Sequence, residues 1–375
     1  MSEYQFYEFA AVDKPVTEDE APYPWSVSSR AEVTPRRWRN VYNWGDFHGS
    51  VEKMMEYYDA HVYLANWGTF WFALAFPENM LSAQDVQPYL TEDWLEVDER
   101  FGRTVLTWTL ADEEPDGEWV EGEGILDQVL PIREELLRGD WRALYLGWLA
   151  RWRWWGDMAD DEDKETLFIL EPPVPAGLGD LTSAQRELSN RLKVDPDLLS
   201  AAAELEVPLP DRGNALRDVV GALSSEEMTA FLLRVAAGEG GRVCAELNRL
   251  VRDRCQNEGT SQRSLGQLWK SARRQRDKRL QRETEEKEQR RREHEAKCRA
   301  HLQSLLEHAD TAWKEADSLA QHRGKTSYDK AAERVRELRD AYALAERDGE
   351  YQERLRAFRD RHGQRPALIR RLADL

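Results

Sequence analysis

The spacing of apolar side chains predicts strands in the first part of the chain. Up to about residue 110, short runs rich in aromatic and β-branched residues are typical of strands. The predicted strands cover residues 4–9, 61–66, 69–76, 94–97 and 103–108. Gly102, just before the last of these, can take a positive φ and close a hairpin. Helices are predicted at residues 50–58 and 82–89, each opened by a serine that can cap its first turn.

From Gly124 onward the apolar residues recur at the helical period. Two helices are predicted between residues 125 and 152, one on each side of Gly139. The segment 171–180 holds three prolines and two glycines, which interrupt both helix and strand and predict a linker. The predicted parts are an acidic, Trp-rich α+β domain with an antiparallel sheet (1–170), the linker (171–180), a helical middle region (181–260) and a C-terminal region (261–375).

The C-terminal region is predicted to be a long charged helix followed by a helical hairpin. Within the predicted helix 261–321, residues 273–297 contain Leu280 and Ala296 as their only apolar positions, among opposite charges three or four residues apart. Such a stretch can stay helical while burying almost nothing. An apolar stripe follows it, and residues 328–346 are expected to fold back onto that stripe. Further short helices are predicted at 182–192, 196–206, 214–223, 226–237, 241–257 and 351–362.

Net charge and tryptophan content also differ between the two halves of the chain. The 375 residues include 53 basic and 71 acidic side chains, a net charge of −18, and 41% of them are hydrophobic, which suffices for a packed core. Residues 1–180 hold 37 acidic and 14 basic side chains, or −23, so the remainder carries −18 + 23 = +5. Thirteen of the 15 tryptophans lie before residue 156. Two architectures are therefore expected in one chain.

The sequence also bears on location. No apolar run approaches the roughly 20 residues that a membrane helix needs, and the amino terminus lacks a basic start followed by an apolar stretch. The cysteines, Cys244, Cys255 and Cys298, form no Cys-x-x-Cys pair that could begin a zinc site or a disulfide framework. We expect a cytoplasmic protein without membrane contact, and no metal or cofactor is predicted.

Four polar residues of the N-terminal half, Asp46, His48, His61 and Asn66, lie in aromatic surroundings. An aspartate can orient an imidazole for acid–base chemistry, which makes Asp46, His48 and Asn66 the candidates for an enzyme site. An aspartate beside a glycine in a turn more often caps the next backbone amide. Neither a Gly-x-Ser-x-Gly elbow nor a catalytic Cys/His context is present, so no catalytic residue is assigned.

Candidate partner-binding residues lie in the C-terminal region. Tryptophan offers a large contact area with few rotatable bonds, as binding patches do. The candidates are Trp269, Arg273, Arg274, Arg279 and Trp313. The arginines could also contact phosphates, yet seven acidic residues lie among the twelve basic ones between 271 and 300, and no aromatic residue is interleaved for base stacking. A protein partner is therefore expected, with nucleic acid as the less favoured alternative.

Three N-terminal segments, 2–9 (SEYQFYEF), 42–49 (YNWGDFHG) and 63–68 (YLANWG), resemble a family of bacterial proteins of unknown function that begin with an aromatic strand. The tail, from 325–329 (KTSYD) to 361–368 (RHGQRPAL), is similar to the helical C-terminus of that family and of some bacterial proteins with a SWIM-type zinc finger. This chain has no Cys-x-Cys and Cys-x-His set, so zinc is not carried over. The resemblance implies a module and no particular reaction.

Taken together, the sequence favours a non-enzymatic bacterial interaction or adaptor protein, in a stress-response or defence operon. The alternatives are an enzyme with its site near Asp46 and His48, and a nucleic-acid-associated factor that uses the basic start of the long helix. The partner and the oligomeric state are not predicted.

Overall fold

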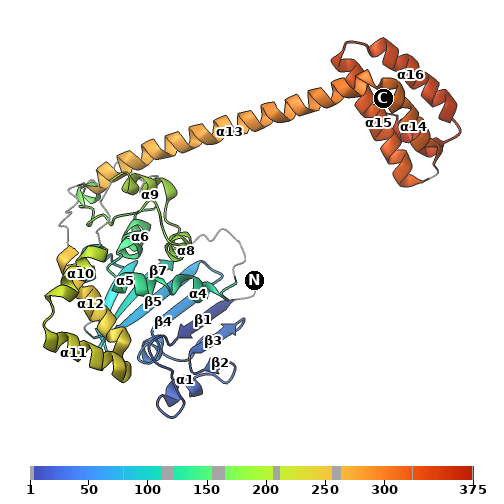
Figure 1. Ribbon diagram of the computed structural model, residues 1–375. Helices are drawn as coiled ribbons and strands as arrows, with labels where there is room; N and C mark the ends of the chain where they lie inside the picture. The colour runs from blue at the N-terminus through green and yellow to red at the C-terminus, as the bar shows by residue number, and fades with distance from the viewer. Residues whose placement is uncertain are drawn as a thin grey trace. The chain divides into compact units, whose positions relative to one another are not determined.

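The computed structural model describes residues 4–78, 80–111, 121–153, 165–205, 212–255, 263–322, 324–373 and 375 (Figure 1). Contacts divide the chain into two compact units, unit 1 (Met1–Asp277) and unit 2 (Lys278–Leu375). The predicted fold class, an antiparallel sheet with helices followed by a mostly helical region, is confirmed. Within the described ranges, no helix is both long and apolar enough to cross a membrane.

Unit 1 is built on a seven-stranded antiparallel sheet with the strand order β2-β3-β1-β4-β5-β7-β6. The strands are β1 (Gln5–Ala10), β2 (Glu32–Thr34), β3 (Arg37–Tyr42), β4 (Ala60–Ala65), β5 (Thr69–Pro77), β6 (Leu95–Arg100) and β7 (Arg103–Ala111). The five strands expected from the sequence are present, and β6 and β7 form the predicted hairpin. The pattern misses β2, which has three residues, and β3, in which Trp38 stands between two arginines.

Side chains alternate between the two faces of the sheet, and the faces differ in character. The first face carries large apolar residues such as Phe6, Phe72 and Leu106, which belong to the main core of unit 1. Helices α4 (Ile125–Val129), α5 (Ile132–Leu137) and α6 (Arg142–Arg151) cover this face (Figure 1). The second face carries Tyr7, Phe9 and Trp38 in a separate cluster, covered by short segments that include α2 (Val51–Met54).

Of the remaining helices of unit 1, those at 22–26 and 166–168 were not predicted, and the others follow the predicted ranges closely. The remaining helices are α1 (Pro22–Ser26), α3 (Ala83–Val86), η1 (Gln87–Tyr89), η2 (Thr166–Phe168), α8 (Ser183–Arg191), α9 (Pro196–Ala203), α10 (Arg212–Ala222), α11 (Ser225–Arg234), η3 (Val235–Glu239) and α12 (Gly240–Cys255). One prediction is corrected. Residues 125–152 form three helices and not two, because Pro131 separates α4 from α5.

The Pro/Gly segment 171–180 lies within unit 1. Val174 and Leu178 are buried in the core shared with the sheet, and the Tyr89 hydroxyl donates to the Pro173 carbonyl at 2.9 Å. Glu171 is fully buried, where Arg263 donates to both of its carboxylate oxygens at 2.6 Å. The division between the two units falls instead at Asp277 and Lys278, inside the long helix.

The long helix, α13 (Leu265–Glu307), ends earlier than predicted. Helix 261–321 was expected to be continuous, but His308 takes φ −110° and ψ 27° and separates α13 from α14 (Ala309–Gln321). The Nδ1 atom of His308 lies 3.0 Å from the Ser304 carbonyl oxygen, a local side-chain bond at the point where the helix breaks. Residues 281–300 are exposed on all sides of α13.

Unit 2 has its own core. Helices α15 (Lys325–Leu344), α16 (Asp348–His362) and α17 (Pro366–Arg371) follow α14, and α14 packs on α15 as the predicted hairpin (Figure 1). Trp313 is buried near Tyr351 and Phe358, with ring centroids 6.1 Å and 5.8 Å away. The short helix α17 was not predicted, and its Leu368 is fully buried in the same core.

Candidate functional site

The second face of the sheet contains a cavity of about 570 Å³, here called the sheet cavity. Its strand residues occupy adjacent positions in the register: His61 pairs with Ala73, Ala73 with Thr107, and Thr107 with Glu96. Small side chains in the middle of this row leave space between larger ones on each side. The volume lies in the range of small-molecule sites.

His61 forms part of the cavity wall and is 1% exposed. Its Nδ1 atom lies 3.0 Å from the Glu8 carbonyl oxygen, which can only accept, so Nδ1 carries the proton. Burial lowers the pKa of His61 from 6.5 to about 4, so the ring is neutral near pH 7. The Nε2 atom is then an acceptor, and it has no hydrogen-bond partner among the described residues.

Tyr7 connects the cavity to the loop before α2. Its hydroxyl lies 3.2 Å from Asp46 Oδ1 and 3.2 Å from Gln5 Oε1. Burial raises the pKa of Tyr7, with nearby Tyr63 and Asp46 adding to the effect, so the hydroxyl stays protonated. The same Asp46 oxygen accepts from the Phe47 backbone amide at 2.7 Å. Asp46 thus has the amide-capping geometry expected of an aspartate in a turn.

Charged side chains form the rim of the sheet cavity. Glu96, Asp98 and Arg100 alternate along β6, and Glu52 approaches from α2. Arg100 forms an ion pair with Asp98. The Ser50 hydroxyl donates to Glu52 at 2.5 Å and lowers the pKa of that carboxyl, with a smaller contribution from the charge of Arg100.

The structure does not bring the three predicted catalytic candidates together. Asp46 lines the sheet cavity, whereas His48 is exposed and is not among its lining residues. Asn66 follows β4, where its Oδ1 accepts from the Tyr4 amide at 3.2 Å. Tyr7 and the β6 residues of the cavity are not among the site residues selected from the sequence. Glu96 lies in the predicted strand 94–97, whereas Asp98 and Arg100 lie in the expected turn; charges at every second position were the available signal that the strand continues to Arg100.

The candidate partner-binding residues are dispersed as well. Trp269 is 8% exposed and belongs to the core of unit 1, and Trp313 is 6% exposed in that of unit 2. Arg273 and Arg274 are exposed. Arg279 donates to Glu283 at 2.9 Å, one of several ion pairs between residues four apart on α13. Such pairing leaves less positive charge for phosphate contacts.

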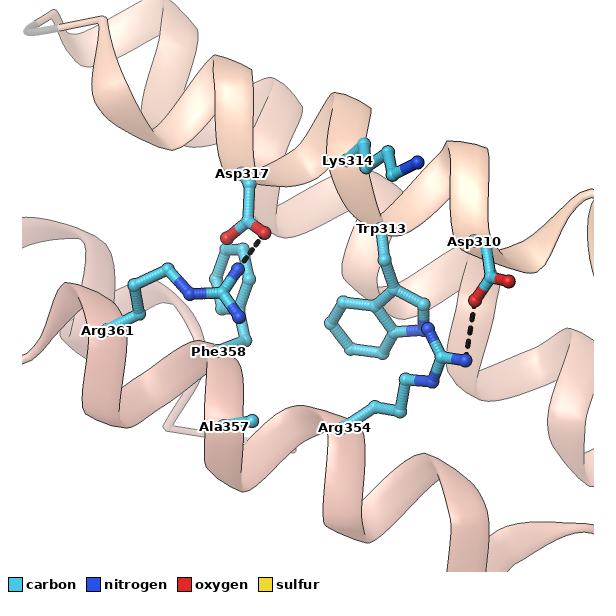
Figure 2. A pocket seen from close by; sticks show the side chains of 8 residues that line it. All are labelled: Asp310, Trp313, Lys314, Asp317, Arg354, Ala357, Phe358 and Arg361. Atoms are coloured by element: carbon cyan, nitrogen blue, oxygen red, sulfur yellow. Dashed lines mark hydrogen bonds and ion pairs between the residues drawn. The ribbon is translucent and has the colours of Figure 1, made fainter.

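Trp313 also borders a groove of about 340 Å³ between α14 and α16 in unit 2. Figure 2 shows its ring between two ion pairs, Arg354 with Asp310 and Arg361 with Asp317. His362, 2% exposed, lies 2.8 Å from Asp317 through its Nε2 atom. These contacts join α16 to α14. The charged residues of this groove therefore have a structural role, in the packing of unit 2.

A different surface is formed by α11, which has no buried residue. Met228 and Leu232 of α11 and Val235, the first residue of η3, follow at positions i, i+4 and i+7 and are 39%, 70% and 47% exposed. Leu233, on the flank of this stripe, is 66% exposed. We call these four side chains the α11 surface. The helix itself is well capped, since Ser224 and Glu227 form a reciprocal capping box.

The described residues contain no group of three His, Cys, Asp or Glu side chains placed to share a metal ion. Comparison of the chain with protein-family models, with curated proteins and with solved structures gives no match.

Proposed function

We propose that this chain is a non-enzymatic interaction protein that binds another protein through the α11 surface. The observation that carries the proposal is the exposed stripe on α11, in a helix with no buried residue. Cytoplasmic location, a stress-response or defence context and the resemblance to a bacterial family remain predictions from the sequence.

The stripe has the spacing of the apolar face of an amphipathic helix, a face that is normally buried against another part of the structure or a partner. Isolated helices of this length are marginal in water, and most helices in proteins depend on the packing of such a face. Covering an exposed leucine contributes about 1.5 to 3 kcal/mol, so three or four such side chains supply a substantial share of a binding energy. Contiguous apolar exposure of this kind marks interaction sites.

Charge near the α11 surface indicates the partner's character. Glu226 and Glu227 lie in the first turn of α11. Arg234, at its last turn, is paired with both Glu239 and Glu246, at 3.1 Å and 2.7 Å. Because the first turn of α11 is acidic and Arg234 is neutralised by two carboxylates, the partner is expected to offer an apolar groove or helix with a basic margin.

The test compares two Leu→Glu variants of the full chain in the cell that naturally makes it. Leu232→Glu places a charge in the stripe, and Leu280→Glu makes the same change at a 47% exposed leucine of α13. Quantitative mass spectrometry of co-purified proteins should show one partner reduced at least about 10-fold by Leu232→Glu and unchanged by Leu280→Glu. Equal recovery with both variants contradicts the proposal.

A further inference from the structure

The direction in which each side chain of α11 points follows from its place in the sequence, because successive residues of an α-helix are turned by about 100°. Only Phe231 and Arg234 of α11 are half-buried, and its other residues are exposed. The Cζ atom of Arg234 lies 5.8 Å from the centre of the Phe231 ring. These two side chains therefore mark the side of α11 that faces the rest of unit 1.

The exposed apolar residues cover more than one side of the helix. Around the circumference, Val235 and Met228 are followed by Leu232, and Leu233 lies at the far end, about 160° from Val235. No charged residue of α11 falls inside this sector. Thr229 lies between the two leucines, and its hydroxyl already donates to the carbonyl oxygen four residues before it, at 2.7 Å. The apolar sector is therefore continuous.

The width of this sector indicates the shape of the partner. A helix that packs on one neighbouring layer usually has an apolar stripe about 100° wide. A flat surface or a single helix laid on Leu232 would leave Leu233 or Val235 in water. A groove with two walls covers all of these side chains, and such grooves receive amphipathic helices with anchors at positions i, i+4 and i+7.

The charges of α11 make the two walls of such a groove different. Glu226 borders the apolar sector beside Leu233, is exposed, and forms no ion pair within the described ranges. The Glu227 carboxylate is already used, since it accepts from the Ser224 amide and hydroxyl, both at 2.8 Å. Arg234 is neutralised by two carboxylates. A basic residue of the partner is therefore expected on the wall beside Leu233.

A second copy of this chain does not fit the requirement. Its own α11 is a ridge, and two ridges cannot enclose each other over about 160°. The sheet cavity has carboxylates at its rim, which would repel Glu226, and the groove between α14 and α16 is crossed by two ion pairs. The occupant is expected to be a different protein.

We propose that α11 inserts as a ridge into an apolar groove of a different protein. One wall of the groove contacts the Met228 side of α11, and the other contacts the Leu233 side and carries a basic residue that pairs with Glu226. This inference rests on the proposed function and adds to it the shape and the charge of the partner's site.

The experiment places a photoreactive residue at position 228, 232 or 233 of the full chain, with position 280 of α13 as the control, in living cells of the natural source. Adducts are identified by mass spectrometry, and the crosslinked peptide of the partner is located in each. Positions 228 and 233 point about 140° apart. All three α11 positions should give adducts with the same protein, those from 228 and 233 on two different secondary-structure elements of it. Position 280 should give none.

A pair of variants tests the basic wall. Glu226→Arg reverses the exposed charge beside the apolar sector and should lower recovery of the co-purified partner about 10-fold. The matched control, Glu286→Arg, makes the same change at an exposed position of α13 and should leave recovery unchanged. Circular dichroism of both variants checks that the helix content is retained.

The outcomes separate this inference from the proposed function. Without an adduct at 232, both fail. If 232 gives an adduct but 228 or 233 does not, or if the adducts from 228 and 233 lie on one element of the partner, the groove is wrong and the proposed function stands. Equal recovery with Glu226→Arg and Glu286→Arg would contradict the basic wall, and adducts with a second copy alone would contradict the assigned occupant.

Discussion

Two helical segments of this protein bury nothing, for opposite reasons. Residues 281–300 of α13 are exposed because almost all are charged or polar, and ion pairs four residues apart support the helix locally. Helix α11 is exposed although it carries an apolar stripe. The charged side chains of the α13 segment are well solvated, so this segment needs no further contact. The apolar side chains of α11 are unfavourably exposed to water, and this difference distinguishes a solvated helix from a binding surface.

The largest effect is expected where a helix does bury its apolar face. Trp313 lies in the core of unit 2, so Trp313→Ala should lower the free energy of unfolding of that unit by about 3 to 5 kcal/mol. Urea unfolding followed by circular dichroism measures it. The unfolding midpoint should not depend on protein concentration, and a midpoint that falls on dilution would place Trp313 in a contact between chains.

A smaller effect is expected in the solvated part of α13. Glu286→Gly should destabilise the helix by about 1 kcal/mol, mostly through backbone entropy and by a few tenths through the lost ion pair with Arg290, because no packing is lost. Hydrogen exchange of residues 281–300 should become about 5-fold faster, since 1 kcal/mol corresponds to that ratio. A loss several times larger would mean that this stretch is packed against something.

Changing the α11 surface should hardly affect folding of the free chain. Leu232 is 70% exposed, so Leu232→Glu should alter stability by no more than about 0.5 kcal/mol, like other surface substitutions. Thermal melting of wild type and variant checks this. A loss of about 2 kcal/mol or more would show that the stripe is used within the chain, and the comparison with α13 would fail.

The smallest effect concerns the start of α11. Hydrogen bonds from the Ser224 backbone and side chain lower the pKa of Glu227 in the folded chain. Its contribution to stability is therefore present above the unfolded pKa and is lost as the pH falls through the lower folded value. Amides of the first turn of α11 should exchange faster in that window. Glu227→Gln, which cannot titrate, should remove this pH dependence.

Local patterns were sufficient for much of the fold. Runs of aromatic and β-branched residues predict β4 to β7, and the charge repeat predicts the exposed stretch of α13. Where a prediction fails, the difference is caused by a single residue or by a contact between residues far apart in the sequence. Pro131 divides one expected helix, and His308 ends another. The prolines of 171–180 suggested a linker, but the buried ion pair between Glu171 and Arg263 ties that segment to a residue 92 positions away.

The candidate sites were harder to predict for the same reason. His61 and Asp46 were selected from the sequence, yet the sheet cavity depends on the register that places Ala73 and Thr107 between His61 and Glu96. The α11 surface has an ordinary amphipathic pattern, and sequence alone cannot tell a stripe that is covered from one that is exposed. Trp269 and Trp313, chosen as binding residues, are core residues instead.

Site-specific photo-crosslinking tests the central claim most directly. A photoreactive residue is placed at position 232 of α11 or at position 280 of α13 in the full chain, and living cells of the natural source are irradiated. The account predicts an adduct with one other protein from position 232, absent from position 280 and abolished by Leu233→Glu. No adduct at 232, equal adducts at both positions, or an adduct with a second copy of this chain alone would contradict it.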